Sequence, residues 1–340
     1  MSQEMLHFGR IDHVILFGGG QTLADVAHYL IGHIDVEVVT SKRHALATVE
    51  GLAVGRVPLL QALESTKIPV AVTDDVGSDT VLKSRIRPCT LGISIGAEWI
   101  FKADFISLFG GRLVNLHGSR LPCMRGGGGF SWLILMNSRE GGSTIHQLVP
   151  GIDQGAIVCS REYTYDDSCR KPVDYIAVTQ RENRELLREF IDGVLAGREF
   201  KTREQAEDQS TYWPRLNTLE HGFIDWSWNV QQIERFICAF DVPYQGASTL
   251  LRGERVFLKD CQATFKEGAF HPFQTGYVYR KMPDSIFVAA SDGSLIIRDA
   301  KDSDGSNLLD RIRLGDRLFT PKDRLEQAAQ FRAVMRPEKL

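Results

Sequence analysis

The stretch Asp12-His-Val-Ile-Leu-Phe-Gly-Gly-Gly20 joins a short apolar run to a glycine turn. Apolar residues then recur at helical spacing up to Leu30, so we predict a buried strand that leads through the turn into a helix. More short apolar runs follow at 36–39, 69–72, 90–95 and 112–115, with room for helices between them. This alternation predicts an open α/β sheet. Ligands bind such sheets beyond the carboxyl ends of the strands, so we expect the chemistry directly after Ile95 and after Val114.

Two glycine clusters fail to match nucleotide-binding motifs. The dinucleotide fingerprint would need a glycine three residues after Gly20, where Leu23 stands, and an acidic residue at the end of the second strand, which is absent. The run Gly126 to Gly129 is followed by Phe130-Ser131, where a P-loop requires Lys and then Ser or Thr. We therefore expect neither a nicotinamide site nor a P-loop.

The second half of the chain changes from a helical to a β pattern. Residues 172–196 have apolar positions at helical spacing and end at Gly197, which predicts a helix with a glycine stop. The polar stretch 201–210 has the composition of a surface linker, and the domain boundary is expected there. After a predicted helix at 229–240, short β-like runs separated by turns predict a small all-β barrel: 247–251, 255–258, 275–279, 285–290 and 294–298.

Composition and charge exclude several classes of function. Forty Lys and Arg residues against 43 Asp and Glu give a net charge of −3, which disfavours a general nucleic-acid binder. No apolar run approaches the ~18 residues of a membrane helix. The first ten residues match neither a secretory signal nor a transit peptide, so we expect a cytoplasmic protein with no membrane partner. The six cysteines lack the spacing of a zinc knuckle or a redox pair and are expected to be reduced.

Candidate catalytic residues lie in two segments, 115–126 and 149–155. Asn115 and His117 are two residues apart at the end of a predicted strand, so both side chains can point the same way, and Asp153 lies between two glycines. An amide that stabilises an oxyanion, a histidine that moves a proton and a carboxylate that orients the histidine would suit acyl transfer. A single histidine after a strand is nevertheless more often a structural residue. His117 has no His or Cys partner at ligand spacing, so no metal is expected.

The same segments resemble a known catalytic signature. Asn115-x-His117, Leu121-Pro122, Arg125-Gly126 and Gly151-Ile-Asp153-x-Gly155 resemble, in this order, the signature of the 10-formyltetrahydrofolate-dependent formyltransferases. Phe223-Ile-Asp-Trp226 and Pro243-Tyr-Gln-Gly-Ala247 resemble the start of the barrel domain found in some members. The resemblance covers residues 11 to 320. It implies a Rossmann-like catalytic domain at 1–205, a linker at 206–222, an OB-like barrel domain at 223–320 and a C-terminal tail at 321–340.

The resemblance also implies roles for individual residues. Asn115 and protonated His117 would stabilise the tetrahedral oxyanion, and Asp153 would hold the imidazole and accept a proton from the amine. The co-substrate would be 10-formyltetrahydrofolate, and no metal would be needed. Its pterin would lie between two loops and contact a set of mainly small and apolar residues: Gly96, Ala97, Trp99, Ile100, Leu121, Val149, Gly151 and Ile152. Met124 and the segment 127–130 depart from the family's usual residues beside the amine pocket, which leaves the acceptor open.

The acceptor is predicted from charge and from one aromatic segment. Residues 221–340 carry 17 Lys and Arg against 16 Asp and Glu, so this part of the chain has almost no excess positive charge. Residues 41–66 also lack the basic loop that is typical of the family members that formylate methionyl-tRNA. Both features favour a small acceptor. A nucleotide-linked amino sugar would need stacking and pyrophosphate contacts, which we assign to Arg125, Tyr212, Trp213 and Arg215. Trp213 is equally well explained as a packing residue between domains.

These observations favour a sugar N-formyltransferase. A methionyl-tRNA formyltransferase, whose partner would be tRNA, is the alternative. A second alternative is an inactive folate- or nucleotide-binding module, against which the intact Asn115, His117 and Asp153 argue. The sequence leaves open a homodimer formed through the barrel.

Overall fold

The computed structural model describes residues 4–51, 55–127 and 129–332. The chain divides into two compact units, and each is built from several segments. The first unit comprises residues 1–126, 141–164 and 178–212, and the second comprises residues 127–140, 165–177 and 213–340. The helix α7 (Pro172–Leu195) contributes to both units. The domain boundaries expected at 205, 222 and 320 stay a prediction, and the end of the expected tail, 333–340, lies outside the described residues.

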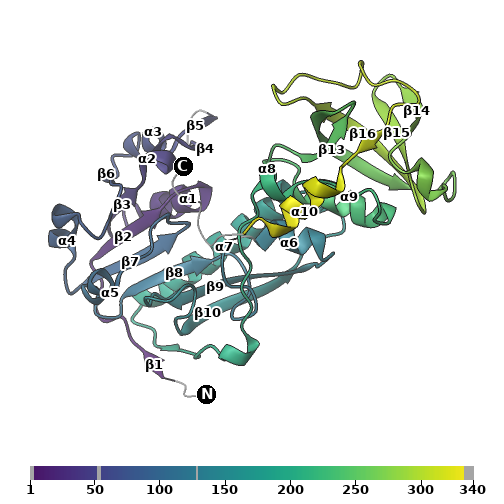
Figure 1. Ribbon diagram of the computed structural model, residues 1–340. Helices are drawn as coiled ribbons and strands as arrows, with labels where there is room; N and C mark the ends of the chain where they lie inside the picture. Colours follow the sequence, from purple (N-terminus) through teal and green to yellow (C-terminus); the bar gives the residue numbers. More distant parts are fainter. Residues whose placement is uncertain (1–3, 52–54, 128, 333–340) are drawn as a thin grey trace. The chain divides into compact units, whose positions relative to one another are not determined.

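A seven-stranded sheet forms the centre of the first unit, in the order β10-β9-β8-β7-β2-β3-β6 (Figure 1). The strands from β8 to β6 run parallel to one another, whereas β9 runs antiparallel to β8. The open α/β sheet predicted from the sequence is confirmed, and β9 and β10 are additions that the sequence did not predict. The strands are β2 (His13–Gly18), β3 (Asp35–Thr40), β6 (Val70–Val72), β7 (Thr90–Ile95), β8 (Leu113–His117), β9 (Glu140–Gln147) and β10 (Ile157–Thr164).

Helices cover both faces of this sheet, because successive strand residues point to opposite faces. Val14 and Leu16 of β2 are buried in a core formed with α1 (Gln21–Leu30), α3 (Leu59–Glu64) and α7. Ile15 and Phe17 are buried on the other face with α4 (Thr80–Arg85) and α5 (Ala103–Ser107). The helix α7 therefore helps to cover the first face of the sheet. Polar side chains of β8 and β9 can lie on the second face, where α5 does not cover the sheet.

The glycine turn after β2 is needed for close packing. Gly18 has a φ of 123°, and a Cβ on it would lie 2.1 Å from the carbonyl oxygen of Ile95 in β7. A Cβ on Gly19 would lie 2.5 Å from Cγ of His44, which belongs to α2 (Lys42–Leu46). Side chains larger than hydrogen would push the ends of β2 and β7 apart at the edge where ligands are expected.

Short elements complete the first unit. The strand β1 (Met5–Leu6) pairs with β11 (Phe200–Lys201), and β4 (Thr48–Glu50) pairs with β5 (Arg56–Pro58). The 3₁₀ helix η1 (Glu207–Gln209) lies in the stretch that the sequence predicted as a linker. No helix in the described part of the chain is both long enough and apolar enough to span a membrane.

A six-stranded antiparallel sheet forms the second unit, in the order β14-β15-β16-β13-β12-β17. Its outer strands approach each other, since the Leu318 N–H donates to the Gly276 carbonyl and the Val278 N–H to the Asp316 carbonyl, both at 2.8 Å. The sheet therefore curls into a partly closed barrel, and the predicted fold class is confirmed. The strands are β12 (Ala247–Leu251), β13 (Glu254–Thr264), β14 (Val278–Met282), β15 (Ser285–Ala290), β16 (Gly293–Lys301) and β17 (Leu318–Phe319).

The helix α9 (Val230–Ala239) packs on this barrel with Ile233 and Ile237 fully buried. Asn229 caps its N-terminus by accepting the Gln232 N–H at 2.9 Å, so the predicted helix at 229–240 is confirmed. The remaining helices of this unit are α6 (Gly129–Leu135), α8 (Thr218–His221), η2 (Pro272–Gln274) and α10 (Lys322–Gln330).

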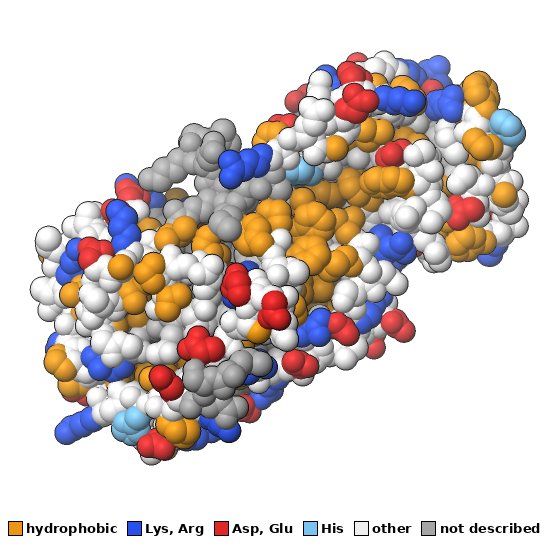
Figure 2. Space-filling view, turned by 60° about the horizontal axis from the view of Figure 1, so that its bottom comes forward, with side chains coloured by type: hydrophobic (Ala, Val, Ile, Leu, Met, Phe, Trp, Pro, Cys, Tyr) orange, Lys and Arg blue, Asp and Glu red, His pale blue; other side chains and the backbone are white. Residues whose placement is uncertain are grey.

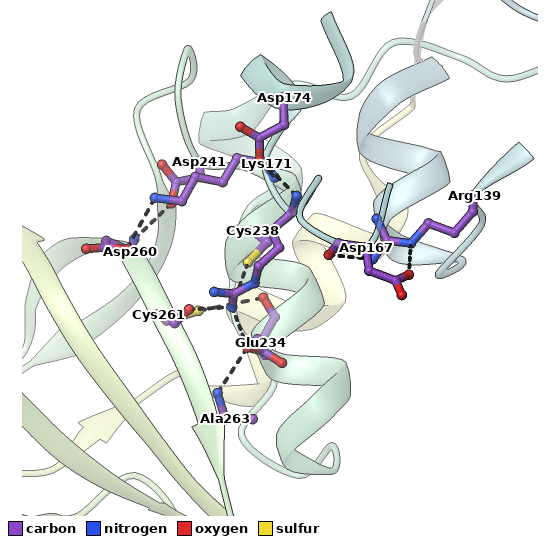
Figure 3. A network of polar contacts seen from close by, with 11 residues as sticks. Arg139, Asp167, Lys171, Asp174, Glu234, Cys238, Asp241, Asp260, Cys261 and Ala263 are labelled. Atoms are coloured by element: carbon purple, nitrogen blue, oxygen red, sulfur yellow. Dashed lines mark hydrogen bonds and ion pairs between the residues drawn. The ribbon is translucent and has the colours of Figure 1, made fainter. Parts of the chain in front are cut away.

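A network of charged groups ties the segment before α7 to α9 and β13 within the second unit (Figure 3). Arg170 Nη2 lies 2.5 Å from Glu234 Oε1 and 2.8 Å from the Cys261 carbonyl oxygen. Lys171 Nζ lies 3.4 Å from Asp241 Oδ2 and 3.3 Å from Asp260 Oδ1. Asp241 is fully buried, so Lys171 supplies the positive charge that a buried carboxylate requires.

Candidate active site

The strands β8 and β9 place three polar side chains on one face of the sheet. Asn115 and His117 alternate along β8 with Leu116, which is buried in the core on the opposite face. The antiparallel pairing sets Asn115 directly opposite His146 of β9. Asn115 Nδ2 lies 3.1 Å from His146 Nε2. The two residues that the sequence predicted to point the same way do so, and His146 joins them.

His117 is buried and held at both ring nitrogens. Its Nε2 lies 2.7 Å from the Met124 carbonyl oxygen and 2.7 Å from Ser119 Oγ. Its Nδ1 lies 3.6 Å from Asp153 Oδ2. Because a carbonyl oxygen only accepts hydrogen bonds, Nε2 carries a proton toward Met124. The Nδ1 side of the ring faces the Asp153 carboxylate.

Asp153 is positioned by a neighbouring loop as well as by the two histidines. Its Oδ2 accepts the Gly126 N–H at 2.9 Å, and its Oδ1 lies 3.5 Å from His146 Nε2. Burial raises the pKa of Asp153, but the charge of His117 and the hydrogen bond from the Gly126 N–H outweigh burial and hold this pKa well below its ordinary value. Asp153 is therefore a carboxylate at neutral pH.

This arrangement contains the groups that acyl transfer needs. The Asn115 amide has a second N–H besides the one aimed at His146, and it can donate to an oxyanion. The imidazole of His117 can hold or move a proton, and the carboxylate of Asp153 can orient it. Among the described residues, no three His, Cys, Asp or Glu side chains are grouped so that they could hold a metal ion.

His146 is the residue of this cluster that sequence reasoning missed. It is 1% exposed, and its Nδ1 lies 2.9 Å from the Gln147 carbonyl oxygen. That carbonyl fixes the proton on Nδ1, so Nε2 is left to accept from Asn115. The only signal in the sequence is a histidine seven residues before Asp153, and its position opposite Asn115 depends on the register of two strands that no local motif encodes.

The loop after β7 carries four of the residues predicted to contact the co-substrate. Gly96 has a φ of 63°, and Ala97 is half-buried beside it. Trp99 packs against the core on the α5 face, and its Nε1 donates to the Asp74 carbonyl oxygen at 3.1 Å. Ile100 is 42% exposed. This loop follows the carboxyl end of β7, as expected for a ligand-binding loop, and its contacts with a ligand stay a prediction.

The other residues predicted for the co-substrate flank the catalytic cluster. Leu121 is buried in the loop that follows β8. Val149, Gly151 and Ile152 are half-buried in the loop that leads from β9 to Asp153. A Cβ on Gly151 would lie 1.9 Å from Gln154 Oε1, so this loop turns tightly at the glycine. Their roles in binding also stay a prediction.

Arg125, predicted to contact the acceptor, is only 5% exposed. Its Nε donates to Gln205 Oε1 at 3.1 Å, and its Nη1 lies 2.9 Å from Glu207 Oε2. Its backbone N–H donates to the Thr211 carbonyl at 3.0 Å, next to an isolated β-bridge with Tyr212. The guanidinium thus contacts Gln205 and Glu207 within the protein, and its role in binding an acceptor stays a prediction.

Trp213 and Arg215 belong to the second unit. The Trp213 ring packs against Trp132 of α6, with 5.4 Å between ring centroids, and Trp132 Nε1 donates to the Pro214 carbonyl at 2.9 Å. Both indoles are half-buried. Arg215 is exposed, and a Cβ on Gly127 would lie 3.8 Å from Arg215 Nε. The roles of Tyr212, Trp213 and Arg215 in binding an acceptor stay a prediction.

Solved structures of low sequence identity share this fold. The sugar 3N-formyl transferase WlaRD, solved in the presence of dTDP and 5-N-formyl-THF, aligns with a TM-score of 0.64 and 18% identity over 85% of this chain and 98% of that chain. An N-formyltransferase from Helicobacter canadensis, in complex with folinic acid and dTDP-3-aminofucose, aligns with a TM-score of 0.62 and 18% identity over 85% and 99% of the two chains.

Relatives by sequence carry a different name. A methionyl-tRNA formyltransferase of Streptococcus agalactiae serotype III is 28% identical over 76% of this chain and 82% of its own length. One from Pelobacter propionicus is 32% identical over 55% of this chain and 56% of its own length. The family model "Formyl transferase" matches residues 89–182, which contain Asn115, His117 and Asp153. The model "Formyl transferase, C-terminal domain" matches residues 217–309, which contain most of the barrel, so this chain is an enzyme of the formyl transferase family.

Proposed function

We propose that this enzyme transfers a formyl group from 10-formyltetrahydrofolate to the amine of a nucleotide-linked amino sugar. One observation carries the chemistry: His117 Nδ1 faces Asp153 Oδ2 at 3.6 Å, on the same face of the sheet as Asn115. These are the three polar residues of the formyltransferase signature, and Asp153 reaches the two residues of β8 from a position 36 residues after His117.

The reaction we propose begins when the uncharged amine attacks the formyl carbon. A C–N bond forms to the acceptor, and the carbonyl oxygen becomes an oxyanion that the Asn115 amide and the His117 imidazolium stabilise. The amine nitrogen loses a proton to the Asp153 carboxylate, directly or through His117, and the Asp153–His117 pair returns a proton to N10 of the folate as the bond from N10 to the formyl carbon breaks. The products are an N-formylated sugar and tetrahydrofolate.

The donor is supported by the position of the predicted pterin loops. The loop of Gly96 to Ile100 follows β7, the strand next to β8, and Val149 to Ile152 lead directly into Asp153. A folate held between them would have its reactive end near His117. The two structural neighbours were solved with formylated folates, which supports the same class of donor here.

The acceptor is supported by charge and by the aromatic segment. Acidic and basic side chains are interspersed on the face drawn in Figure 2, and the whole chain has a net charge of −3. A polyanion such as tRNA is usually met by a positive surface, whereas a nucleotide sugar needs only a few contacts. Trp213 and Arg215 can supply stacking and a pyrophosphate contact. Both structural neighbours were solved with dTDP or a dTDP-linked amino sugar.

Methionyl-tRNA formylation is the second candidate. It is favoured by the sequence relatives, which are named methionyl-tRNA formyltransferases and match up to 83% of this chain at 25% to 32% identity. The chemistry at the formyl carbon would be the same, and only the acceptor would differ.

A ligand screen separates these candidates. The purified protein is mixed with 10-formyltetrahydrofolate and then with nucleotide-linked 3-amino sugars, nucleotide-linked 4-amino sugars or methionyl initiator tRNA, and thermal stability and formylated product are measured. We expect one nucleotide sugar to raise the melting temperature and to be formylated. Product from the charged tRNA alone would favour the second candidate. Folate binding without turnover of any acceptor would indicate an inactive binding module.

A further inference from the structure

The segment 203–212, which the sequence predicted as a polar linker, lies along the catalytic loops of the first unit. Arg203 forms a β-bridge with Ile157, next to the loop of Asp153. At the other end, the Thr211 N–H donates to the Pro122 carbonyl at 3.3 Å, and the Arg125 N–H donates to the Thr211 carbonyl at 3.0 Å. This segment, which we call the strap, therefore contacts both the loop after β8 and the loop after β9.

Gln205 is the strap residue that joins the two loops. Its Nε2 donates to the backbone carbonyl of Asp153 at 2.7 Å and to that of Gly155 at 2.8 Å. Its Oε1 accepts from Arg125 Nε at 3.1 Å. One amide side chain thus holds the backbone of the Asp153 loop with its donor end and the Arg125 loop with its acceptor end.

The geometry of the Asp153 carboxylate depends on the distance between these loops. Gly126, the residue after Arg125, donates its N–H to Asp153 Oδ2 at 2.9 Å. Asp153 also has a φ of 51°, a left-handed conformation that its surroundings must maintain. Without Gln205, the loop that carries the carboxylate and the loop that carries its N–H donor would lose their common side-chain bridge.

We propose that Gln205 is a positioning residue, which holds the Asp153 carboxylate in register with Gly126 and His117. This inference rests on the proposed function only in taking Asp153 as part of the reaction. Glu207 lies on the same strap and contacts the same arginine, but 74% of its side chain is exposed and its carboxylate otherwise contacts Ser210 of the strap itself. The amide oxygen of Gln at this position can still accept from Arg125, so Glu207→Gln leaves the buried guanidinium with a partner and provides a matched control.

The first test needs no substrate. The charge of His117 and the hydrogen bond from the Gly126 N–H hold the pKa of Asp153 low, and loosening the loop weakens both contacts. Carboxyl carbons are labelled with ¹³C, and the Asp153 signal, assigned from Asp153→Asn, is followed against pH in Gln205→Met and Glu207→Gln. We expect Gln205→Met, which keeps the volume but makes no hydrogen bonds, to raise the pKa of Asp153 toward its ordinary value. Glu207→Gln should leave it where it is in the unmodified protein.

The second test uses turnover. We expect Gln205→Met to lower kcat about 10- to 100-fold, because a small displacement of a reacting group is costly, while Glu207→Gln stays within about threefold of the unmodified enzyme. Gln205→Ala is a second variant for the case that Met does not fold, and melting temperatures show which proteins are folded. An unchanged Asp153 titration in a folded Gln205 variant overturns the proposal, whatever happens to its stability.

The two tests also separate this inference from the proposed function. If the unmodified protein formylates no amino sugar but Gln205→Met raises the pKa of Asp153, the proposed function fails and the role of Gln205 stands. If the amino sugar is formylated and Gln205→Met alters neither the Asp153 titration nor kcat, the proposed function stands and the role of Gln205 fails.

Discussion

Asn115 of β8 lies directly opposite His146 of β9, and its Nδ2 is 3.1 Å from the Nε2 of that histidine. The contact sets the orientation of the Asn115 amide, because His146 Nδ1 is occupied by the Gln147 carbonyl and leaves Nε2 as the acceptor. The nitrogen of the amide therefore faces the cluster, with one N–H bound and one N–H available. His146 therefore orients the Asn115 amide so that its N–H groups can donate hydrogen bonds.

We predict that His146→Leu lowers kcat by about 10-fold or more, because the Asn115 amide loses its fixed orientation and one preorganised oxyanion donor is worth about 10²–10³ in rate. His146→Gln, whose Oε1 can still accept from Asn115, should retain more of the activity. Steady-state kinetics on the two variants check this. Equal activity in His146→Leu and the unmodified enzyme would mean that Asn115 needs no partner.

A second prediction concerns the pair His117 and Asp153. His117→Asn and Asp153→Asn should each lower turnover by about 10² or more, because each removes proton transfer or electrostatic stabilisation from the reaction. Binding of the folate should stay within a few fold, since neither side chain is among those predicted to hold the pterin. Single-turnover formyl transfer and folate titration measure the two quantities. Full activity in either variant would remove that residue from the reaction.

The sequence was informative wherever the signal was local. Strand periodicity with a two-residue spacing predicts that Asn115 and His117 share a face, and the structure places them so. The place of His146 in the cluster follows only from the register of two antiparallel strands. The partners of Arg125, Gln205 and Glu207, lie 80 and 82 positions away in the sequence, so no local pattern indicates them. The polar composition of 201–210 predicts a linker, because the hydrogen bonds of Gln205 reach residues 50, 52 and 80 positions away, which no local pattern encodes.

A third prediction concerns the pH dependence of stability. His13, at the start of β2, is 6% exposed, and burial lowers its pKa even though the charge of Glu37 opposes this. The unfolded chain therefore binds more protons than the folded chain as pH falls below about 6.5, and stability is lost in that range with a slope of at most about 1.4 kcal/mol per pH unit. Urea unfolding at two pH values on either side of 6.5 measures the slope.

His13→Asn should reduce this slope, because the substituted side chain does not titrate. His7→Asn is the matched control, since His7 is exposed. A slope that is identical in His13→Asn and the unmodified protein would assign the pH dependence to other groups.

A fourth prediction distinguishes the two acceptors by salt. A nucleotide sugar carries few charges, so its KM should change only slightly between ~50 and ~200 mM salt. A tRNA held by six to ten phosphate contacts would lose about 10³–10⁵ in affinity over the same range. The reason is that the release of counterions from the tRNA favours binding less at a higher salt concentration. Acceptor KM measured at several salt concentrations decides between them, and a steep slope with tRNA would favour the methionyl-tRNA reaction.

The last prediction concerns Trp213, whose ring contacts Trp132 at 5.4 Å between centroids and remains half-buried. If Trp213 stacks on the base of the acceptor, Trp213→Ala should raise the acceptor KM by about 5- to 150-fold, the equivalent of ~1–3 kcal/mol, and leave folate binding unchanged. We expect this result, together with a modest fall in melting temperature from the lost contact with Trp132. If Trp213 only packs, the substitution should instead cost about 3–5 kcal/mol of stability and leave the KM of the folded protein unchanged. Trp132→Ala is the control, because its Nε1 is already bound to the Pro214 carbonyl and its loss should act mainly on stability. A large fall in melting temperature with an unaltered acceptor KM in Trp213→Ala would remove Trp213 from the acceptor site and assign it to the packing of the second unit.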